Sequence, residues 1–328
     1  MIRPVRNLIL IAIGTVLICT IRLLIDHPPG EGISLAWPDQ SWIEFRRTAV
    51  LAAATVGAAL GLAGVLLQTM LRNPLASPFI LGISSGAGLG LMVATWISYI
   101  TIGATASLPG SGGVPALLGA LGALSLVYAL GQRRGWPDPV SLVLVGVVVS
   151  TIAAGGMMFF QHLVPTGLRG SFTTWLMGHI PEIVSNQRLL VAGVLTIVGV
   201  IVCMRLAKPL DASLLGDDEA RSIGVSLGPL RLVVLIIAGV LTAIAVSLAG
   251  PIAFIGLVSP HLARLLVGGR HAMLVPGAVG CGIMLLVGAD VLRQVIDVGG
   301  GRMPVGVLTT IGGGVVFLVL LRMELHRS

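Results

Sequence analysis

Charged residues are scarce in this chain of 328 residues. They make up 10% of the sequence, while hydrophobic residues make up 55%. An ordinary soluble domain carries roughly 25% charged residues, so this composition argues against a soluble fold. The only lysine, Lys208, is followed by Pro209, which excludes a GxxxxGK[ST] phosphate-binding loop. The sequence therefore predicts a membrane protein that does not itself bind ATP by that route.

Residues for metal or covalent chemistry are also few. Cys19, Cys203 and Cys281 lie far apart inside apolar segments, without CxxC or metal-like spacing, and are interpreted as packing residues. His261 has no neighbouring Cys, Asp or Glu and makes a poor metal site. The sequence contains no HExxH motif and no recognisable Ser/His/Asp arrangement. Basic residues stand singly or in pairs between apolar runs, which argues against a nucleic-acid partner.

Long apolar runs dominate what is present. A helix of about 20 mostly apolar residues crosses a bilayer, so the runs predict an all-α integral membrane protein with about ten transmembrane helices. The first run could be a signal peptide, but its length and the lack of a small-residue cleavage site favour a retained helix. The predicted spans are 7–25, 49–71, 79–102, 114–131, 139–161, 188–206, 229–249, 257–268, 274–295 and 305–322.

Two features of these runs indicate how the helices pack. The chain has 45 glycines, which are frequent where transmembrane helices approach closely. The run 257–268 is short and is interrupted by Ser259-Pro260-His261, so we expect a partial helix beside a re-entrant segment.

Orientation and symmetry follow from basic residues and from a short repeat. With the N-terminus inside, most basic residues fall on the cytoplasmic side, which predicts that the N- and C-termini are both cytoplasmic. The sequence Leu-Ala-Gly occurs at 62–64 and again at 248–250. Each copy is followed at the same spacing by a proline, Pro74 or Pro260. Because the two runs cross in opposite directions, residues 1–328 are predicted to form a single permease-like domain with inverted-repeat-like halves.

The predicted cytoplasmic loop 207–228 contains the segment LLGDDEARSIGV. Gly216 and Asp217 can cap a short helix, acidic residues suit its positive end, and Gly224 can close it. Apolar residues at Leu214, Leu215, Ala220 and Ile223 would suit docking into a groove on a partner protein. A solvated connector helix is the alternative.

Four stretches carry a resemblance to a known family. They are GLAGVLLQTMLRNPLASPFILGISSGAGLG at 61–90, LLGDDEARSIGV at 214–225, LAGPIAFIGLVSPHLARLLVGGRH at 248–271 and MPVGVLT at 303–309. The sequence resembles the FecCD permeases, which import ferric siderophores, haem and cobalamin. Two departures are Arg302, where many relatives carry an acid, and Gly312-Gly313-Gly314, which replaces a common Gly-Ala-Pro.

The resemblance implies an ABC transporter permease of the bacterial cytoplasmic (inner) membrane that works by alternating access. Its implied partners are a second permease subunit (identical or related), two ATP-binding subunits and an external substrate-binding protein. It implies no cofactor on this chain, with ATP and Mg bound by the partner ATPase. The expected cargo is a ferric siderophore-like chelate, with haem or cobalamin as alternatives. An ion-coupled carrier is a weaker hypothesis, since few ionisable residues, chiefly Asp290, Arg293, His162 and His261, lie in or near the spans.

Residue roles also follow from the resemblance. The ATPase-coupling helix would comprise Leu215, Gly216, Asp217, Asp218, Glu219, Ala220, Arg221 and Gly224. A cytoplasmic gate would be formed by Asn73, Pro74 and Leu75, with Pro139, Val140 and Ser141 as a second layer. Arg46, Arg47 and Arg293 would dock the binding protein, although Arg293 could instead pair locally with Asp290. The run 141–161 would either line the pathway, through Ser150, Thr151, Met157 and Met158, or serve ordinary helix packing.

Overall fold

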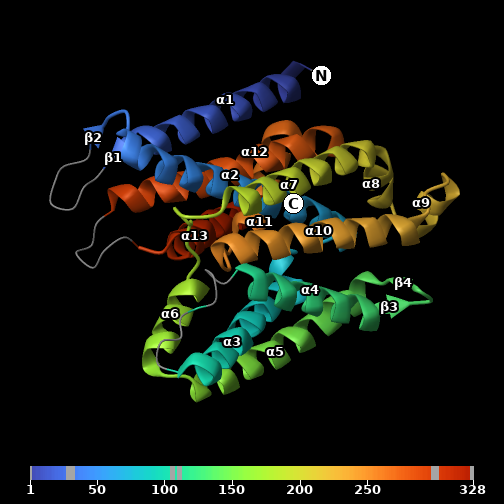
Figure 1. The fold of residues 1–328 in the computed structure, drawn as a ribbon. Coiled ribbons are helices and arrows are strands. Elements are labelled where there is room, and N and C mark those ends of the chain that lie inside the picture. Colours follow the sequence, from blue (N-terminus) through green and yellow to red (C-terminus); the bar gives the residue numbers. More distant parts are fainter. Residues whose placement is uncertain (1, 27–33, 104–107, 109–112, 297–302, 326–328) are drawn as a thin grey trace.

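The computed structural model of the chain describes residues 2–26, 34–103, 108, 113–296 and 303–325. Helices dominate, with two short hairpins between them (Figure 1). The helices are α1 (Ile2–Leu24), α2 (Gln40–Met70), η1 (Pro78–Leu81), α3 (Ile83–Ile102), α4 (Gly113–Leu130), α5 (Pro139–Leu163), α6 (Thr166–Leu176), α7 (Asn186–Arg205), α8 (Ala207–Ser213), α9 (Asp217–Ser222), α10 (Leu227–Ala249), α11 (Ile255–Val267), α12 (His271–Val295) and α13 (Val305–Leu325). The hairpins pair β1 (Ile25–Asp26) with β2 (Ser34–Leu35) and β3 (Gln132–Arg133) with β4 (Trp136–Pro137).

Each of the ten predicted apolar runs falls on a helix, which confirms the all-α membrane fold. Within the described residues, 8 helices are long and apolar enough to cross a bilayer: α1, α2, α3, α4, α5, α7, α10 and α12. Two further apolar helices are shorter, α11 and the stretch Val305–Val319 of α13.

The irregular segment near α11 lies earlier in the chain than expected. Pro260 is inside a continuous helix, and Ser259 Oγ donates a hydrogen bond of 2.6 Å to the carbonyl of Ile255. The break falls instead on the non-helical stretch before α11, where Gly250 and Phe254 both have positive φ angles, 69° and 67°. The prediction of an interruption at Ser259-Pro260-His261 was therefore wrong in position: Pro260 lies inside the helix, where its missing N–H leaves the carbonyl of Gly256 without its usual helical bond.

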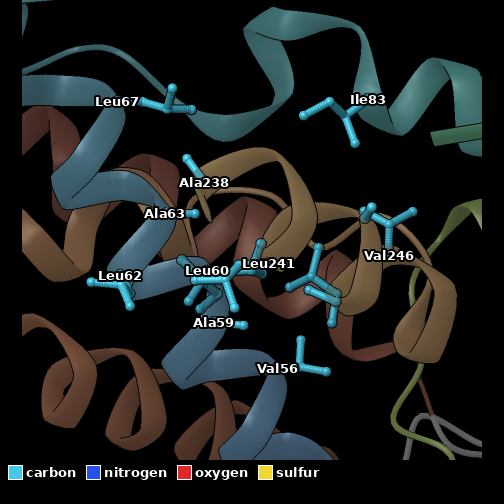
Figure 2. Packing of buried hydrophobic residues seen from close by; sticks show 14 of the residues in the cluster. Val56, Ala59, Leu60, Leu62, Ala63, Leu67, Ile83, Ala238, Leu241 and Val246 are labelled. Atoms are coloured by element: carbon cyan, nitrogen blue, oxygen red, sulfur yellow. The ribbon is translucent and has the colours of Figure 1, made fainter. Parts of the chain in front are cut away.

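Helix α2 forms the centre of the core and packs on α10, α11 and α12. Figure 2 shows side chains of α2, including Leu60, beside Leu241 of α10. Backbone-to-backbone packing brings these helices together: a Cβ added to Gly57 would lie 2.4 Å from the carbonyl oxygen of Gly282 on α12. The expectation that glycine permits close helix approach is confirmed here.

Helices α3, α4 and α5 form a second group that lies along one side of α10 (Figure 1). Glycine again sets the spacing, since Gly86 of α3 and Gly119 of α4 meet with no room for a Cβ on either. Gly146 of α5 packs in the same way on the backbone of η1, at Ile80. The short helix η1 therefore links the second group to the end of α2.

The bundle has two distinct ends (Figure 1). One end carries α8, α9 and the β3–β4 hairpin, and we call it the α9 end. The opposite end carries α6 and the β1–β2 hairpin. The N-terminal part of α1 lies at the α9 end, where Asn7 Nδ2 donates a hydrogen bond to the carbonyl of Leu266.

The two Leu-Ala-Gly sequences do not occupy equivalent positions. The first is inside α2, whereas the second ends α10 at Gly250. A Pro-x-Ala sequence follows each helix: Pro74-Leu75-Ala76 comes after α2, two residues beyond Arg72, and Pro251-Ile252-Ala253 comes after α10, directly beyond Gly250, and Arg72 and Gly250 both have positive φ. The first turn lies at the α9 end and the second at the opposite end.

Candidate functional site

The predicted coupling segment is a pair of short helices, α8 and α9, at one end of the bundle (Figure 1). Gly216 is the N-cap of α9 with φ 147°, and no side chain caps the helix. Gly224, with φ 87°, closes the helix through its N–H bond to the carbonyl of Arg221. The glycine boundaries of the predicted helix are therefore confirmed, while capping by Asp217 is not.

Asp217 instead anchors α9 to the bundle. Its carboxylate lies 2.6 Å from Arg72 Nη2, after α2, and 2.8 Å from Arg231 Nη2 on α10. Partial burial alone would raise the pKa of Asp217, but the hydrogen bonds and charges of Arg231 and Arg72 outweigh it and lower the pKa below its ordinary value. The carboxylate therefore stays ionised at neutral pH and joins three elements.

Exposed apolar residues flank α9 at both of its ends. Leu215 and Ile223 are 67% and 61% exposed, and Leu214 is also exposed. Ala220, predicted as a fourth anchor, is fully buried against the bundle, so it cannot contact a partner. Asp218, Glu219 and Arg221 are exposed beside these apolar residues, with a surface ion pair between Asp218 and Arg221. An apolar patch framed by charge is suited to protein docking.

A hollow of about 900 Å³ lies between α9, the start of α10 and the β3–β4 hairpin. Arginines and two acids contribute the charged groups of its wall, and Trp136 packs over Gly228. Its lining includes Arg133, Arg134, Trp136, Asp138, Asp217, Arg221 and Arg231. This hollow was not predictable from the sequence, because its walls come from segments far apart in the chain.

The turn after α2 and the start of α5 hold the residues predicted to form a gate. Asn73 Oδ1 accepts a hydrogen bond of 2.8 Å from the N–H of Leu75, which fixes the turn around Pro74. At α5, Pro139 occupies the first turn, and the Asp138 carboxylate accepts bonds from the N–H and hydroxyl of Ser141.

These contacts leave both segments ordered at the α9 end. The bond from the backbone N–H of Ser141, then the bond from its hydroxyl, hold the pKa of Asp138 below its ordinary value. Leu75 and Val140 are both exposed, which is compatible with a gate. Asp138 was missed, although an acid directly before a proline and three residues before the N–H that it caps is a helix-start signal.

The four residues predicted to line a pathway on α5 do not share one face. Met157 packs its sulfur onto Gly88 of α3, and Ser150 lies against Gly82. Thr151 and Met158, which lie two turns apart, are exposed on the outer side of the helix. Ser150 and Met157 therefore serve packing within the subunit, because the helical repeat of 3.6 residues turns them away from Thr151 and Met158.

A cavity of about 340 Å³ brings together segments that the sequence separates widely. It lies near the turn after α10, and its walls are mainly apolar with the hydroxyl of Thr310 among them. The residues lining it are Phe79, Leu176, Met177, Pro251, Ala253, Gly306, Val307, Thr310 and Ile311. Beside it, the ring of Phe254 packs on Gly313 and Gly314 of α13, and a Cβ at Gly313 would lie 2.5 Å from Phe254 Cβ. Two residues of the triple glycine, Gly313 and Gly314, thus accommodate Phe254.

The arginines predicted to dock a partner differ in exposure. Arg47 is exposed, and Arg46 Nη1 donates hydrogen bonds to the carbonyls of Leu23 and Ile25 at the end of α1. Arg293 is 8% exposed, so the prediction that it meets a partner was wrong for this conformation. Its Nε donates to Asp290 inside the bundle, while its buried Nη2 has no hydrogen-bond partner among the described residues.

Arg293 belongs to a buried ionic cluster. Its Nε lies 2.9 Å from Asp290 Oδ1, as the alternative interpretation of a local pair predicted, and its Nη2 lies 3.6 Å from Glu182. Arg22 of α1 also pairs with Asp290, which was not foreseen. Burial, and then the charge of Arg293, lower the pKa of His179 in the segment between α6 and α7.

Comparisons with known proteins cover nearly the whole chain. A family model described as the FecCD transport family matches residues 8–323. The chain is similar to the hemin transport system permease of Yersinia pestis, with 35% identity over 290 residues that cover 88% of this chain and 85% of that protein. It is also similar to the ferric enterobactin transport system permease of Escherichia coli K12, with 33% identity over 287 residues that cover 87% of this chain and 83% of that protein.

A solved structure agrees in fold. A chain described as an inward-facing ABC transporter of the metal-chelate type superposes with a TM-score of 0.83 and 28% sequence identity. The match covers 97% of this chain and 99% of that chain.

Proposed function

Because this chain belongs to the FecCD transport family and is a permease subunit of an ABC importer, we propose that it carries a ferric siderophore-like chelate. It is a multi-pass protein of the bacterial inner membrane, and ATP is hydrolysed by separate ATPase chains. The cargo is the part of this function that the family leaves open, since the relatives are described as carrying different cargoes.

The observation that carries the proposal is the likeness, over 97% of the chain, to a transporter of the metal-chelate type. The ferric enterobactin permease, at 33% identity, supports the same cargo class. The cavity of about 340 Å³ is consistent with it, because its mainly apolar lining has few groups with which to hold a polar chelate tightly. Selectivity would then rest with the external binding protein.

The proposed cycle uses the two ends of the bundle. ATP and Mg bind the partner ATPase subunits, whose movement is received by α9 through Leu215 and Ile223. Asn73–Leu75 and Pro139–Ser141 form the cytoplasmic gate, and Thr151 and Met158 face the pathway between this chain and a second permease subunit. Arg46 and Arg47 meet the binding protein outside.

Haem is the second candidate cargo. The hemin permease has 35% identity to this chain, slightly above the enterobactin permease. Its porphyrin is flat and largely apolar, so a mainly apolar cavity would also suit it. The two cargoes must therefore be separated by experiment.

Uptake of labelled ferric enterobactin, haemin and cobalamin into cells that lack their own importers tests the proposal. Wild type is compared with a chain lacking residues 216–224, at equal amounts in the membrane, and with Leu190→Ala, a change on the exposed face of α7, as control. Uptake of ferric enterobactin that is lost in the deletion supports the proposal. Uptake of haemin alone would show that the cargo is haem and not a ferric siderophore. Full uptake in the deletion variant would exclude the coupling role of α9.

Dependence on energy source separates an importer driven by ATP from an ion-coupled carrier. We expect uptake to stop when the partner ATPase carries an inactive phosphate-binding loop, and to continue in vesicles supplied with ATP and an ionophore. The reverse pattern would favour an ion-coupled carrier.

A further inference from the structure

Three residues from α8, α12 and α2 form a hydrogen-bonded chain, close to the coupling helix, that runs from the partly exposed Asp211 to the buried His271 and Thr69. The ring Nδ1 of His271 lies 2.6 Å from Asp211 Oδ1, and its Nε2 lies 2.8 Å from Thr69 Oγ1. The side chain of His271 is fully buried, and Thr69 is 4% exposed. No function was predicted from the sequence for any of these three residues.

Asp211 holds His271 in two ways. The same carboxylate oxygen also accepts the backbone N–H of His271, at 2.9 Å, at the first residue of α12. An ionised carboxylate only accepts hydrogen bonds, so Nδ1 carries a proton and Nε2 is directed at Thr69. One residue of α8 therefore fixes both the backbone and the ring orientation at the start of α12.

Hydrogen bonds connect α8 rigidly to α9 between Asp211 and Asp217. After α8, the N–H of Leu214 bonds the carbonyl of Asp211 and the N–H of Leu215 bonds that of Ala212. Arg72 donates to the carbonyl of Ser213, at 2.9 and 2.7 Å, and pairs with Asp217 of α9. A displacement of α9 is therefore passed to Asp211.

The contacts that fix α8–α9 to the bundle differ in burial. The ion pair of Asp217 with Arg72 is partly exposed to water, where ion pairs contribute little and salt screens them. Asp211 is 38% exposed, but His271 and Thr69 are buried, so the bond between these two is enclosed, where a hydrogen bond is stronger and its loss leaves an unsatisfied polar group. The inner link of the chain, from His271 to Thr69, is therefore more enclosed than the ion pair of Asp217 with Arg72.

We propose that Asp211, His271 and Thr69 are positioning residues that transmit the movement of the coupling segment to α2 and α12. The inference rests on the proposed function, in which α9 receives the ATPase movement. Helix α2 lies at the centre of the core, and α12 continues to the opposite end, where Arg293 meets Glu182. The chain thus connects the α9 end to helices that reach the far end.

The test uses the assembled transporter, with its ATPase and binding proteins, in lipid vesicles. Thr69→Val removes the hydroxyl at nearly constant volume, Thr69→Ser restores it, and Asp211→Asn keeps an acceptor at the same position. Thr242→Val is the matched control, because Thr242 is fully buried on α10 and donates to the carbonyl of Ala238 in its own helix.

Two readouts are compared. The first is the rate of ATP hydrolysis, and the second is the ATP-driven change in maleimide labelling of a cysteine introduced at the exposed position Ile311. The native cysteines Cys19, Cys203 and Cys281 are replaced by alanine in every variant. We expect Thr69→Val to hydrolyse ATP at close to the wild-type rate while the labelling change falls about tenfold. The full labelling change should persist in Thr69→Ser, Asp211→Asn and Thr242→Val.

The outcomes separate this inference from the proposed function, since labelling does not depend on the cargo. An unchanged labelling response in Thr69→Val would overturn the transmission role. If Thr69→Val lost ATP hydrolysis, the labelling change and folded protein in parallel, the role of Thr69 would be purely structural, and the transmission role would again be overturned. If the wild-type complex showed no ATP-driven labelling change, the proposed function would be contradicted, and so would the transmission role that rests on it.

Discussion

Gly64 of α2 and Gly256 of α11 meet backbone to backbone: a Cβ on Gly64 would lie 1.9 Å from the carbonyl oxygen of Gly256. The same Cβ would also lie 3.0 Å from Pro260 Cγ. No rotation of a side chain can relieve such a contact, so the spacing of the two helices depends on the missing methyl group.

Gly64→Ala should therefore destabilise the protein by about 1–3 kcal/mol, the usual effect of overpacking a core. Thermal unfolding in detergent, followed by the loss of monodisperse protein, measures the change. Gly122→Ala on α4 is the control, since nothing lies within 4 Å of its added Cβ. Equal midpoints for the two variants would contradict the close contact.

Asp290→Ala should be among the most destabilising single changes in the chain. It leaves Arg22 and Arg293 buried without their shared acid, and breaking a buried ion pair costs roughly 3–5 kcal/mol. The amount of folded protein in the membrane and its unfolding midpoint report the effect. Glu182→Ala, at the partly exposed edge of the same cluster, should change both much less.

The anchoring of α9 should weaken in acid. The folded-state pKa of Asp217 is lowered, so its stabilising effect is present above the unfolded pKa and is lost as the pH falls through the folded value. We expect the rate at which pepsin cuts the 207–228 segment, divided by its rate on an unfolded reference peptide at the same pH, to rise as the pH falls from 5 to 2. In Asp217→Asn this ratio should be high at every pH, and a steep pH dependence there would contradict the assignment.

Leu215→Ala combined with Ile223→Ala should reduce copurification of the ATPase subunits about tenfold, because these exposed apolar side chains would form the centre of the contact. The unfolding midpoint of the permease should stay unchanged, since neither residue packs in the core. Leu195→Ala, on α7, controls for an exposed apolar change elsewhere.

Arg47→Glu should weaken docking of the external binding protein and reduce the salt dependence of its association rate. Surface plasmon resonance at several salt concentrations measures this. Arg46→Glu should in addition lower stability, because Arg46 donates to the carbonyls of Leu23 and Ile25. Identical salt dependence in Arg47→Glu and wild type would remove Arg47 from the docking site.

The sequence predicted the helices well because membrane spans depend on local composition. The apolar runs and the glycine boundaries of α9 at Gly216 and Gly224 were confirmed for this reason. Contacts between distant segments were not predictable: Asp217 with Arg231, Asp211 with His271, and Arg22 with Asp290 join residues whose pairing depends on how the helices pack. Arg293 was misassigned because the sequence shows a charge near a span end but not its depth.

The pairing of Arg22 with Asp290 also constrains the order of events during synthesis. The two residues are 268 positions apart in the chain, so α1 leaves the ribosome long before its acid exists. At roughly 5–20 residues per second, the delay is on the order of 15–50 s. During that interval Arg22 must remain near the membrane surface or in contact with the insertion machinery. The seating of α1 against α12 is therefore a late step, reached after almost all of the protein has been made.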